Sequence, residues 1–112
     1  MIKIVLTTID SADSARQLAQ ILVTERLAAC VNIIPEVRSV YKWEGRLEES
    51  AELLLVIKTT PECLPALIDR IREAHPYDLP EAVALSVEDG LPDYLDWVMR
   101  QVRVPEDPLA GD

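Results

Sequence analysis

Several residue types are scarce in this 112-residue chain, and each scarcity excludes a class of protein. Its two cysteines, Cys30 and Cys63, stand 33 positions apart, so the closely spaced cysteine pairs of zinc knuckles and thioredoxin-like motifs are missing. No apolar run approaches the roughly 20 residues that a membrane-spanning helix needs. The first residues alternate like a strand and do not form an apolar leader. We therefore expect a cytoplasmic protein with reduced thiols and no membrane contact.

Basic residues are also scarce, because 11 Lys and Arg stand against 20 Asp and Glu, a formal net charge of −9. The phosphates of a nucleic acid would be repelled by this charge, which argues against nucleic-acid binding. Cations, cationic partners or simple solubility are compatible with it. The sequence also lacks a phosphate-binding P-loop, a G-x-S-x-G motif and an H-E-x-x-H motif. We therefore expect a protein that is not an enzyme.

Hydrophobic periodicity predicts one domain, residues 1–104, with the element order βαββαβ followed by a last helix. Thr60 is the expected N-cap of the second helix, with Pro61 in its first position. At Pro35 the second strand should be bent, bulged or at the edge of the sheet, and residues 105–112 have the composition of a disordered tail. The predicted strands and helices are, in chain order, residues 2–7, 12–26, 28–41, 52–60, 61–74, 81–87 and 91–102.

This order predicts an α+β fold, a ferredoxin-like βαββαβ sandwich with both main helices on one face of the sheet. Residues 53–57 are apolar on both faces of their strand, so the face without helices needs another cover. Association with another copy of the chain is the simplest way to bury this face of the sheet, which favours a homo-oligomer. The long second and third strands, joined by a turn at residues 43–46, would project as a ribbon able to pair with another chain's sheet edge.

The segment from His75 to Glu81 holds the only histidine, beside a phenol and two carboxylates, and two prolines stiffen it. The imidazole, with an oxygen of Glu81 or Asp78, could bind a divalent metal. The alternative is that His75 completes the unpaired carbonyls at a helix end. Cys30 is a second candidate ligand, because thiolate suits copper. Its alternative is a small residue of the core.

Three further groups of residues are candidates for a binding site or an interface. Cys63 is expected in the first turn of a helix as a partly exposed thiol whose pKa the helix dipole lowers. Lys58 ends an apolar strand; beside Tyr77 or Glu81 it would make a pocket for an anion, and otherwise it reaches solvent. The chain has no phenylalanine, and each of its aromatic residues carries a polar atom, which suits a cleft wall or an interface. They are Tyr41, Trp43, Tyr77, Tyr94 and Trp97.

Five stretches of the sequence together carry a family resemblance. They are Leu27-Ala28-Ala29-Cys30-Val31-Asn32-Ile33-Ile34-Pro35, Tyr41-Lys42-Trp43-Glu44-Gly45, Leu55-Val56-Ile57-Lys58-Thr59, His75-Pro76-Tyr77 with Pro80-Glu81, and Asp93-Tyr94-Leu95-Asp96-Trp97. In this order, over about residues 2–102, they resemble the CutA family of divalent-cation tolerance proteins. The family usually has a glycine after the proline of the second strand, where this chain has Glu36.

The resemblance implies a ferredoxin-like subunit assembled as a homotrimer similar to the PII nitrogen-regulatory proteins. It also implies a role in tolerance of copper and other divalent metals, with no other cofactor required. On this reading Cys30, His75 and Glu81 are the metal contacts. A PII-like sensor is the alternative, with a small anion held between subunits by Lys58, Tyr77, Glu81 and the aromatic residues. A trimeric scaffold for another protein is a third possibility.

Proline and glycine usage adds an expectation about stability. The chain has eight prolines, only three glycines and clustered charges. Proline-rich loops with little glycine and clusters of ion pairs are features of thermophile proteins, so we expect the protein to be thermostable.

Overall fold

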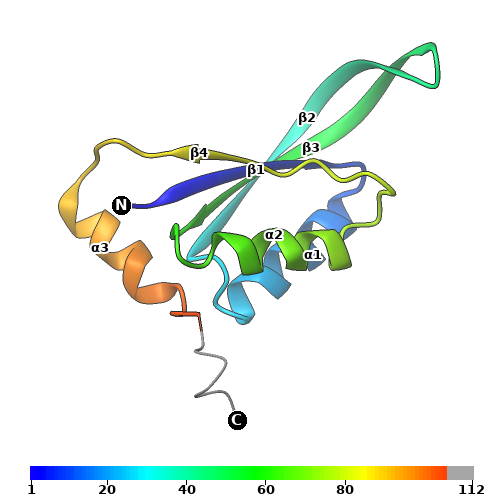
Figure 1. Ribbon diagram of the computed structural model, residues 1–112. Helices are drawn as coiled ribbons and strands as arrows, with labels where there is room; N and C mark the ends of the chain where they lie inside the picture. Colours follow the sequence, from blue (N-terminus) through cyan, green and yellow to red (C-terminus); the bar gives the residue numbers. More distant parts are fainter. Residues whose placement is uncertain (106–112) are drawn as a thin grey trace.

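The computed structural model, which describes residues 1–105, follows the predicted order of strands and helices (Figure 1). The predicted tail lies outside the described residues except for Pro105. None of the described helices is long and apolar enough to cross a membrane. The elements are β1 (Lys3–Ile9), α1 (Ala12–Thr24), β2 (Cys30–Trp43), β3 (Arg46–Thr59), α2 (Leu64–Ala74), β4 (Val83–Ser86) and α3 (Pro92–Gln101).

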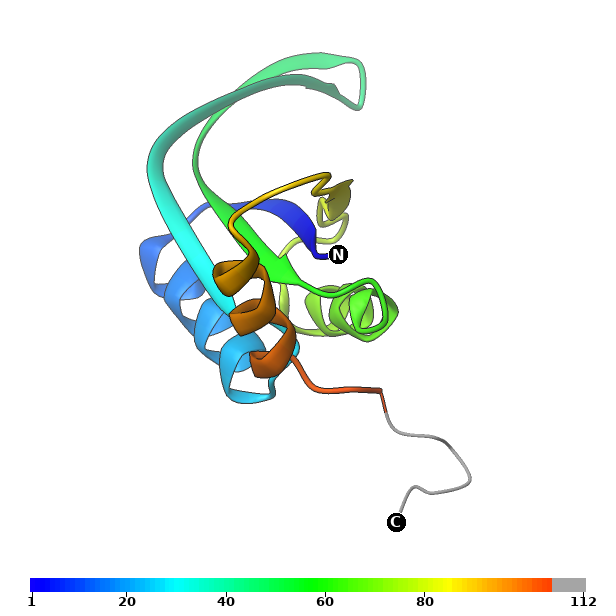
Figure 2. The same ribbon diagram turned by 90° about the vertical axis from the view of Figure 1, so that its left-hand side faces the viewer.

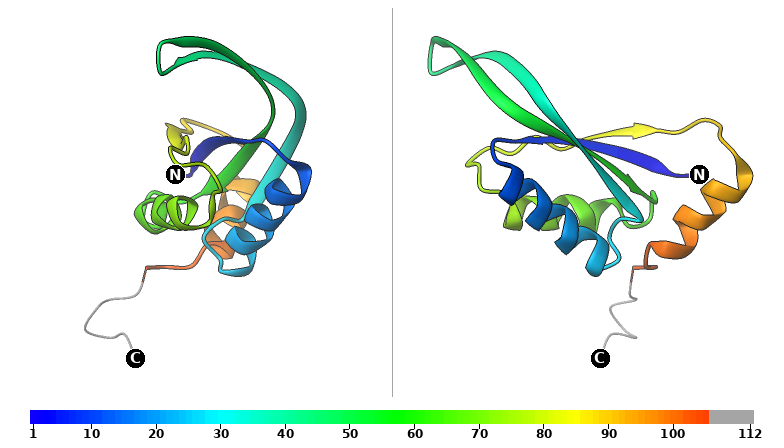
Figure 3. Two further views of the ribbon diagram at one scale, coloured as in Figure 1. Left: turned by 90° about the vertical axis from the view of Figure 1, so that its right-hand side faces the viewer. Right: turned by 180° about the vertical axis from the view of Figure 1, so that it is seen from behind.

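The four strands form one sheet in the order β2-β3-β1-β4, and every neighbouring pair is antiparallel. Both α1 and α2 pack on the same face of this sheet, as predicted (Figures 1 and 3). Side chains of β1 point alternately to the two faces of the sheet, and α1 and α2 cover the face of Val5, Thr7 and Ile9, which are buried. Ile4 and Leu6 point to the other face and are only partly buried. The predicted α+β architecture is confirmed at the level of the single chain.

The core lies between the sheet and the two helices. Leu18 and Leu22 occupy one face of α1 at a spacing of four residues, and Leu67 and Ile71 do the same on α2. They meet apolar side chains of β1 and β3, such as the fully buried Leu55. Burial of each such side chain stabilises the fold by about 1.5–3 kcal/mol. The amphipathic spacing in the sequence is therefore what places the helices on the sheet.

The opposite face of the sheet, here called the open face, carries no helix among the described residues. Its aliphatic side chains come from β1, β3 and β4, where Val83 is 49% and Leu85 is 53% exposed. The run at residues 53–57 therefore meets helices on one side and leaves apolar groups on the other, in line with the two-sided pattern of its sequence. The open-face side chains are Ile4, Leu6, Leu54, Val56, Val83 and Leu85.

The β2–β3 hairpin is longer than predicted, because β3 begins at Arg46 and not at residue 52. Residues 46–51 are mostly polar and gain their strand structure from pairing with β2, which a burial pattern does not reveal. Glu44 and Gly45 both have positive φ, at 51° and 80°, as the tight turn between two paired strands requires. The pairing of β1 with β3 stops at Leu53, so the rest of the hairpin projects and curls back over the sheet (Figure 2).

The predicted irregularity at Pro35 is confirmed. The register between β2 and β3 shifts between Ile34 and Val37, which leaves Pro35 and Glu36 outside the ladder. Pro35 has no N–H to give to the ladder, and Glu36 adopts a φ of 63°. This left-handed conformation favours glycine, which gives a physical reason for the glycine that the resemblance leads one to expect here.

Two predictions at the start of α2 are wrong. The helix begins at Leu64, and Thr60 instead accepts a hydrogen bond from the backbone N–H of Cys63 at 3.3 Å, within a turn that precedes the helix. Cys63 is fully buried and not partly exposed. Burial raises the pKa of the Cys63 thiol, the opposite of the lowering that a helix dipole at an exposed site would give.

The C-terminal end of α3 is attached to the loop after α1 through Arg26. The guanidinium of Arg26 donates to the backbone oxygens of Gln101 and Arg100, each at 3.0 Å. Its own backbone oxygen accepts from the N–H of Arg103 at 2.8 Å. Arg26 itself has a φ of 59° just after α1 ends. A cation at a helix C-terminus is electrostatically favourable, so this contact fixes α3 against the rest of the chain.

A candidate ligand-binding groove

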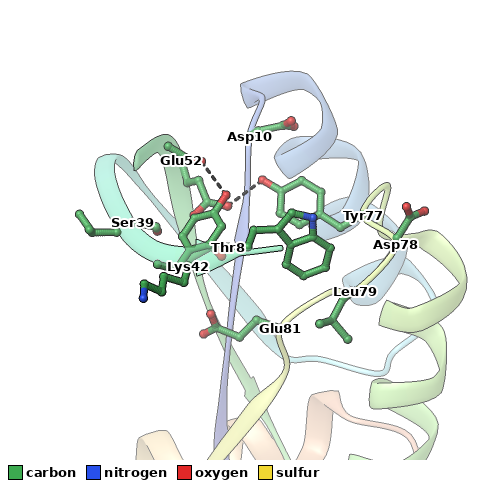
Figure 4. A pocket seen from close by; sticks show the side chains of 13 residues that line it. Thr8, Asp10, Ser39, Lys42, Glu52, Tyr77, Asp78, Leu79 and Glu81 are labelled. Carbon is green, nitrogen blue, oxygen red and sulfur yellow. Dashed lines mark hydrogen bonds between the residues drawn. The ribbon is translucent and has the colours of Figure 1, made fainter. Parts of the chain in front are cut away.

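An open groove of about 900 Å³ lies between the curled hairpin and the segment that joins α2 to β4 (Figure 4). One wall is the hairpin and the other is residues 77–81, with the end of β1 between them. We call this hollow the acidic groove. Its lining residues are Thr8, Asp10, Ser39, Val40, Tyr41, Lys42, Trp43, Ser50, Glu52, Tyr77, Asp78, Leu79 and Glu81.

The most buried charged group of the groove is Glu52 on β3, which is only 7% exposed. It lies beside the register shift of the hairpin, paired with Val37. The hydroxyl of Tyr77 donates to Glu52 Oε2 at 2.7 Å. Among the described residues no hydrogen bond reaches the other carboxylate oxygen. The buried side-chain atom without a partner among the described residues is Thr7 Oγ1, so the Glu52 carboxylate is not an orphaned buried group.

Tyr77 is a donor to Glu52 at every ordinary pH. Burial and then the hydrogen bond and charge of Glu52 raise the pKa of Tyr77 well above its usual value near 10. The hydroxyl therefore keeps its proton and shares it with the carboxylate. Because Glu52 belongs to the hairpin and Tyr77 to the opposite wall, this bond ties the two walls of the groove together (Figure 4).

His75 positions the second wall. It caps the end of α2 and is 6% exposed. Its Nε2 lies 2.8 Å from the backbone oxygen of Thr8, and its Nδ1 lies 3.2 Å from the backbone nitrogen of Tyr77. A carbonyl only accepts and an amide N–H only donates, so the imidazole is the neutral form protonated on Nε2. A metal ion could bind His75 only by displacing one of these two partners.

The charge of the groove is negative. Asp10, Asp78 and Glu81 are exposed carboxylates on its rim, and with Glu52 they face a single cation, Lys42. These groups come from the residue after β1, from β2 and β3, and from the segment after α2, so residues far apart in the sequence create one local field. Such a field attracts cations and repels anions.

Aromatic rings lie between these charges. Tyr41 and Trp43 come from the hairpin, and the Tyr41 hydroxyl lies 2.9 Å from the hydroxyl of Ser50. Tyr77 packs its ring edge to face with His75 at 4.6 Å between centroids. Three of the five aromatic residues thus line the groove, and their role in a cleft or an interface stays a prediction. Tyr94 and Trp97 stack at 5.8 Å on α3, at the other end of the sheet (Figure 1).

Cys30 does not lie near His75. Cys30 pairs with Lys58, whereas Thr8, the partner of His75, pairs with Leu54 on the same strand. Four residues of strand separate these positions, about 13 Å at 3.3 Å per residue. Within residues 1–105 no three His, Cys, Asp or Glu side chains are placed to hold one metal ion. A single chain therefore does not bring the predicted ligands Cys30, His75 and Glu81 together.

Lys58 also lies outside the groove. It is half-buried, and its ammonium donates to the side-chain oxygen of Asn32. Six residues separate it from Glu52 along β3, roughly 20 Å. Within one chain, the predicted anion pocket of Lys58 with Tyr77 and Glu81 is not formed. Of its two interpretations, the strand-end lysine fits the position better.

Glu52 and Asp10 are groove residues that the sequence did not single out. The sequence contains one signal that could have pointed to Glu52, because this carboxylate stands directly before five consecutive apolar residues of a strand. A charge at the start of an apolar strand is commonly exposed, so only the curled hairpin reveals that it is covered.

Comparison with known proteins identifies related chains. The family model described as CutA1 divalent ion tolerance protein matches residues 3–101. The Divalent-cation tolerance protein CutA of Thermus thermophilus is 49% identical over 98 residues, covering 88% of this chain and 95% of the relative. Human Protein CutA is 45% identical over 96 residues, and this chain spans 54% of its length. The chain thus spans nearly all of this bacterial relative but about half of the human one.

Solved structures agree with the sequence matches. The divalent cation tolerance protein Cut A1 from Thermus thermophilus aligns with a TM-score of 0.89 at 47% identity, covering 92% of this chain and all of that one. CutA1 from Pyrococcus horikoshii aligns with a TM-score of 0.86 at 39% identity, covering 92% of this chain and 99% of that one. Both alignments thus cover nearly the whole of each chain.

Proposed function

We propose, on the premise that this chain belongs to the CutA1 divalent ion tolerance family, that it serves divalent-cation tolerance as a metal-binding homotrimer. Membership of the family supports the tolerance role. Assembly and metal binding are our proposals for this chain. Copper is the metal we propose first, because the one half-buried thiol of the chain is a soft ligand.

The observation that carries this proposal is the open face of the sheet. It presents aliphatic side chains from three strands, and the edge strand β4 is exposed along its whole length. Each half-exposed side chain of this kind would add roughly 1 kcal/mol on burial. Three copies packed around their open faces would cover these groups, and a contiguous apolar patch of this sort is typical of an interface.

The same face suggests where a metal ion would bind. Cys30 opens β2, and its register partner Lys58 belongs to the open-face side of β3. Cys30 therefore lies beside the proposed interface, where a neighbouring copy can add ligands. Glu81 is an exposed carboxylate and is available in the same way. His75 is better assigned to positioning the groove wall, since both of its ring nitrogens are engaged.

The geometry does not favour the alternative of an anion sensor. Lys58 is held by Asn32, and the acidic groove carries four carboxylates against Lys42. A small anion entering that groove would meet repulsion from the carboxylates, with one exposed ammonium to offset it.

Two measurements test the proposal. Sedimentation equilibrium should give the mass of three chains, and a monomer would contradict the assembly. Copper titration followed by tryptophan fluorescence should show saturable binding that Cys30→Ala and Glu81→Gln weaken. Cys63→Ala is the matched control, because it removes a thiol that is buried away from solvent. Unchanged copper binding in Cys30→Ala would exclude the thiol as a ligand.

Location and stability complete the proposal. We propose a cytoplasmic protein with two free thiols and a melting temperature above the ordinary mesophile range. Some relatives are named for other compartments, as in "Protein CutA 1, chloroplastic" of rice. Fractionation of the source cells and a thermal melt test these two points, and a melting temperature of 45–65 °C would contradict the second.

A further inference from the structure

We infer that His75 is an acid-sensitive latch, which holds residues 76–82 against the sheet and releases them when its ring takes up a proton. His75 is not one of the copper ligands proposed above, and the latch requires neither a metal nor a second copy of the chain. None of residues 76–82 is fully buried. Among the described residues, none of them makes a backbone–backbone hydrogen bond either. The segment therefore depends on side chains for its attachment.

Two hydrogen bonds that involve side chains hold the segment in place. The backbone N–H of Tyr77 donates to Nδ1 of His75 at 3.2 Å, and the hydroxyl of Tyr77 donates to Glu52 at 2.7 Å. The other ring nitrogen, Nε2, donates to the backbone oxygen of Thr8 on β1 at 2.8 Å. The imidazole thus connects the segment to the sheet, and the bond to the hairpin starts from the same residue, Tyr77.

This arrangement works only with a neutral ring. Nδ1 needs its free electron pair to accept from Tyr77, while Nε2 uses its proton for Thr8. A proton taken from solvent turns Nδ1 into a second donor, which then faces the donor N–H of Tyr77. It also places a positive charge on a side chain that is only 6% exposed. Imidazole is the side chain that ordinarily titrates between about pH 5 and 8, so mild acid should open the latch.

The charges around the segment do not oppose protonation. The cation in the last turn of α2, Arg72, already pairs with Asp69 at 3.0 Å. Carboxylates on the neighbouring elements stabilise an imidazolium by their negative charge, and a ring that leaves its two backbone partners also gains hydration. These carboxylates are Asp10 after β1, Glu52 on β3, Glu73 near the end of α2 and Asp78 in the segment itself.

Opening of the latch also affects the hairpin. When Tyr77 moves away, the Glu52 carboxylate on β3 loses its donor, and the bond between the two walls of the acidic groove is broken. Pro76 and Pro80 restrict the backbone on either side of this tyrosine, so the segment moves as one piece. His75 thereby couples the pH of the surroundings to the position of this segment and to its bond with the hairpin.

Nuclear magnetic resonance of the ¹⁵N-labelled full-length protein, without metal and from about pH 7.5 to about pH 5, tests this inference. The chain has one histidine, so its ring signals are unambiguous. We expect one protonated ring nitrogen at the upper end of this range and two at the lower end. Protection of the Tyr77 amide, relative to its intrinsic exchange rate, should fall by about tenfold per pH unit as the second proton binds. The amide of Leu67 in α2 is the internal control and should keep its protection.

Two variants separate the latch from other effects of acid. Glutamine offers one donor and one acceptor but takes up no proton in this range, so His75→Gln should keep the Tyr77 amide protected throughout. His75→Ala should leave this amide unprotected at every pH. Should either variant fail to fold, the titration of the parent decides by itself.

The contradicting outcomes are equally defined. The inference is overturned if Tyr77 keeps its protection down to about pH 5, whether or not the ring becomes charged. It is also overturned if His75→Gln loses protection in acid as the parent does, because titration of the carboxylates would then be responsible. These outcomes are independent of copper binding and of the mass of the assembly, so they leave the test of metal tolerance separate.

Discussion

Replacement of Tyr77 by phenylalanine is the sharpest test of the groove as a built structure. Tyr77→Phe keeps the ring and its contact with His75 but removes the only hydrogen bond to the Glu52 carboxylate among the described residues. A hydrogen bond to a charged group contributes about 1.5–3 kcal/mol, and its removal leaves a buried carboxylate without a partner. The groove is open to water, which can replace part of the loss. We therefore expect a destabilisation of about 2 kcal/mol.

Urea unfolding followed by circular dichroism, at one fixed protein concentration, measures this loss. Tyr41→Phe is the matched control, because it removes a hydroxyl whose partner, Ser50, lies on the same exposed hairpin. It should cost less than about 1 kcal/mol. A double-mutant cycle of Tyr77→Phe with Glu52→Gln should show a coupling energy of at least about 1 kcal/mol.

The effect has a defined dependence on pH. The unfolded chain releases the Tyr77 proton near pH 10, whereas the folded chain retains it because its pKa is raised. The folded state then binds more protons, so the stabilisation by Tyr77 is complete below pH 10 and falls above it by about 1.4 kcal/mol per pH unit. The difference between parent and Tyr77→Phe should shrink accordingly. Equal costs for the two tyrosine variants, or a coupling energy near zero, would refute the reasoning.

Three further predictions concern backbone and core. Glu36→Gly should stabilise the protein by about 0.5 kcal/mol in the same urea assay. The φ of 63° at this position costs an L-residue about 1–2 kcal/mol, and glycine loses about 0.5–1 kcal/mol in chain entropy. Glu49→Gly, in a regular strand, is the control and should destabilise the protein. Cys63→Ser should cost about 1–3 kcal/mol, since it buries a hydroxyl in place of a thiol, and a thiol reagent should label Cys63 only on unfolding. Arg26→Ala should lower the free energy of unfolding by about 1 kcal/mol, speed hydrogen exchange of the α3 amides and change the fluorescence of Trp97. If the α3 amides exchange as slowly as in the parent, Arg26 does not hold α3 in place.

Local patterns explain why most elements were predictable. Apolar residues at helical spacing in α1 and α2, and alternation in β1, depend only on neighbours in the sequence. The predictions that failed depend on distant partners. Thr60 and Pro61 have the composition of a helix start, but the chain makes a further turn before Leu64, and this turn buries Cys63. The polar half of β3 is a strand only because β2 pairs with it.

The candidate site divides in the same way. His75 was open to two interpretations from the sequence, and its position before a proline at the end of a helix already suggested a cap. The structure places His75 at the C-cap position of α2, but its ring bonds the Thr8 oxygen and the Tyr77 N–H and not the carbonyls of the helix end. The separation of Cys30 from His75 could not be predicted, since it depends on strand order and register. From the sequence, Glu52 is the charged first residue of a strand and is expected to be exposed. The structure covers it with the curled hairpin.

The sequence by itself therefore determined the order of the elements, the face of each helix that enters the core, the bulge at Pro35 and an uncovered apolar face. These follow from burial and from backbone chemistry over a few residues. Only the tertiary structure decided which charges share a site. Along the sequence, about 30 to 40 residues separate Asp10 from Glu52 and Glu52 from Glu81. They line one groove because the hairpin, beyond its register shift, curls toward the segment that His75 holds in place.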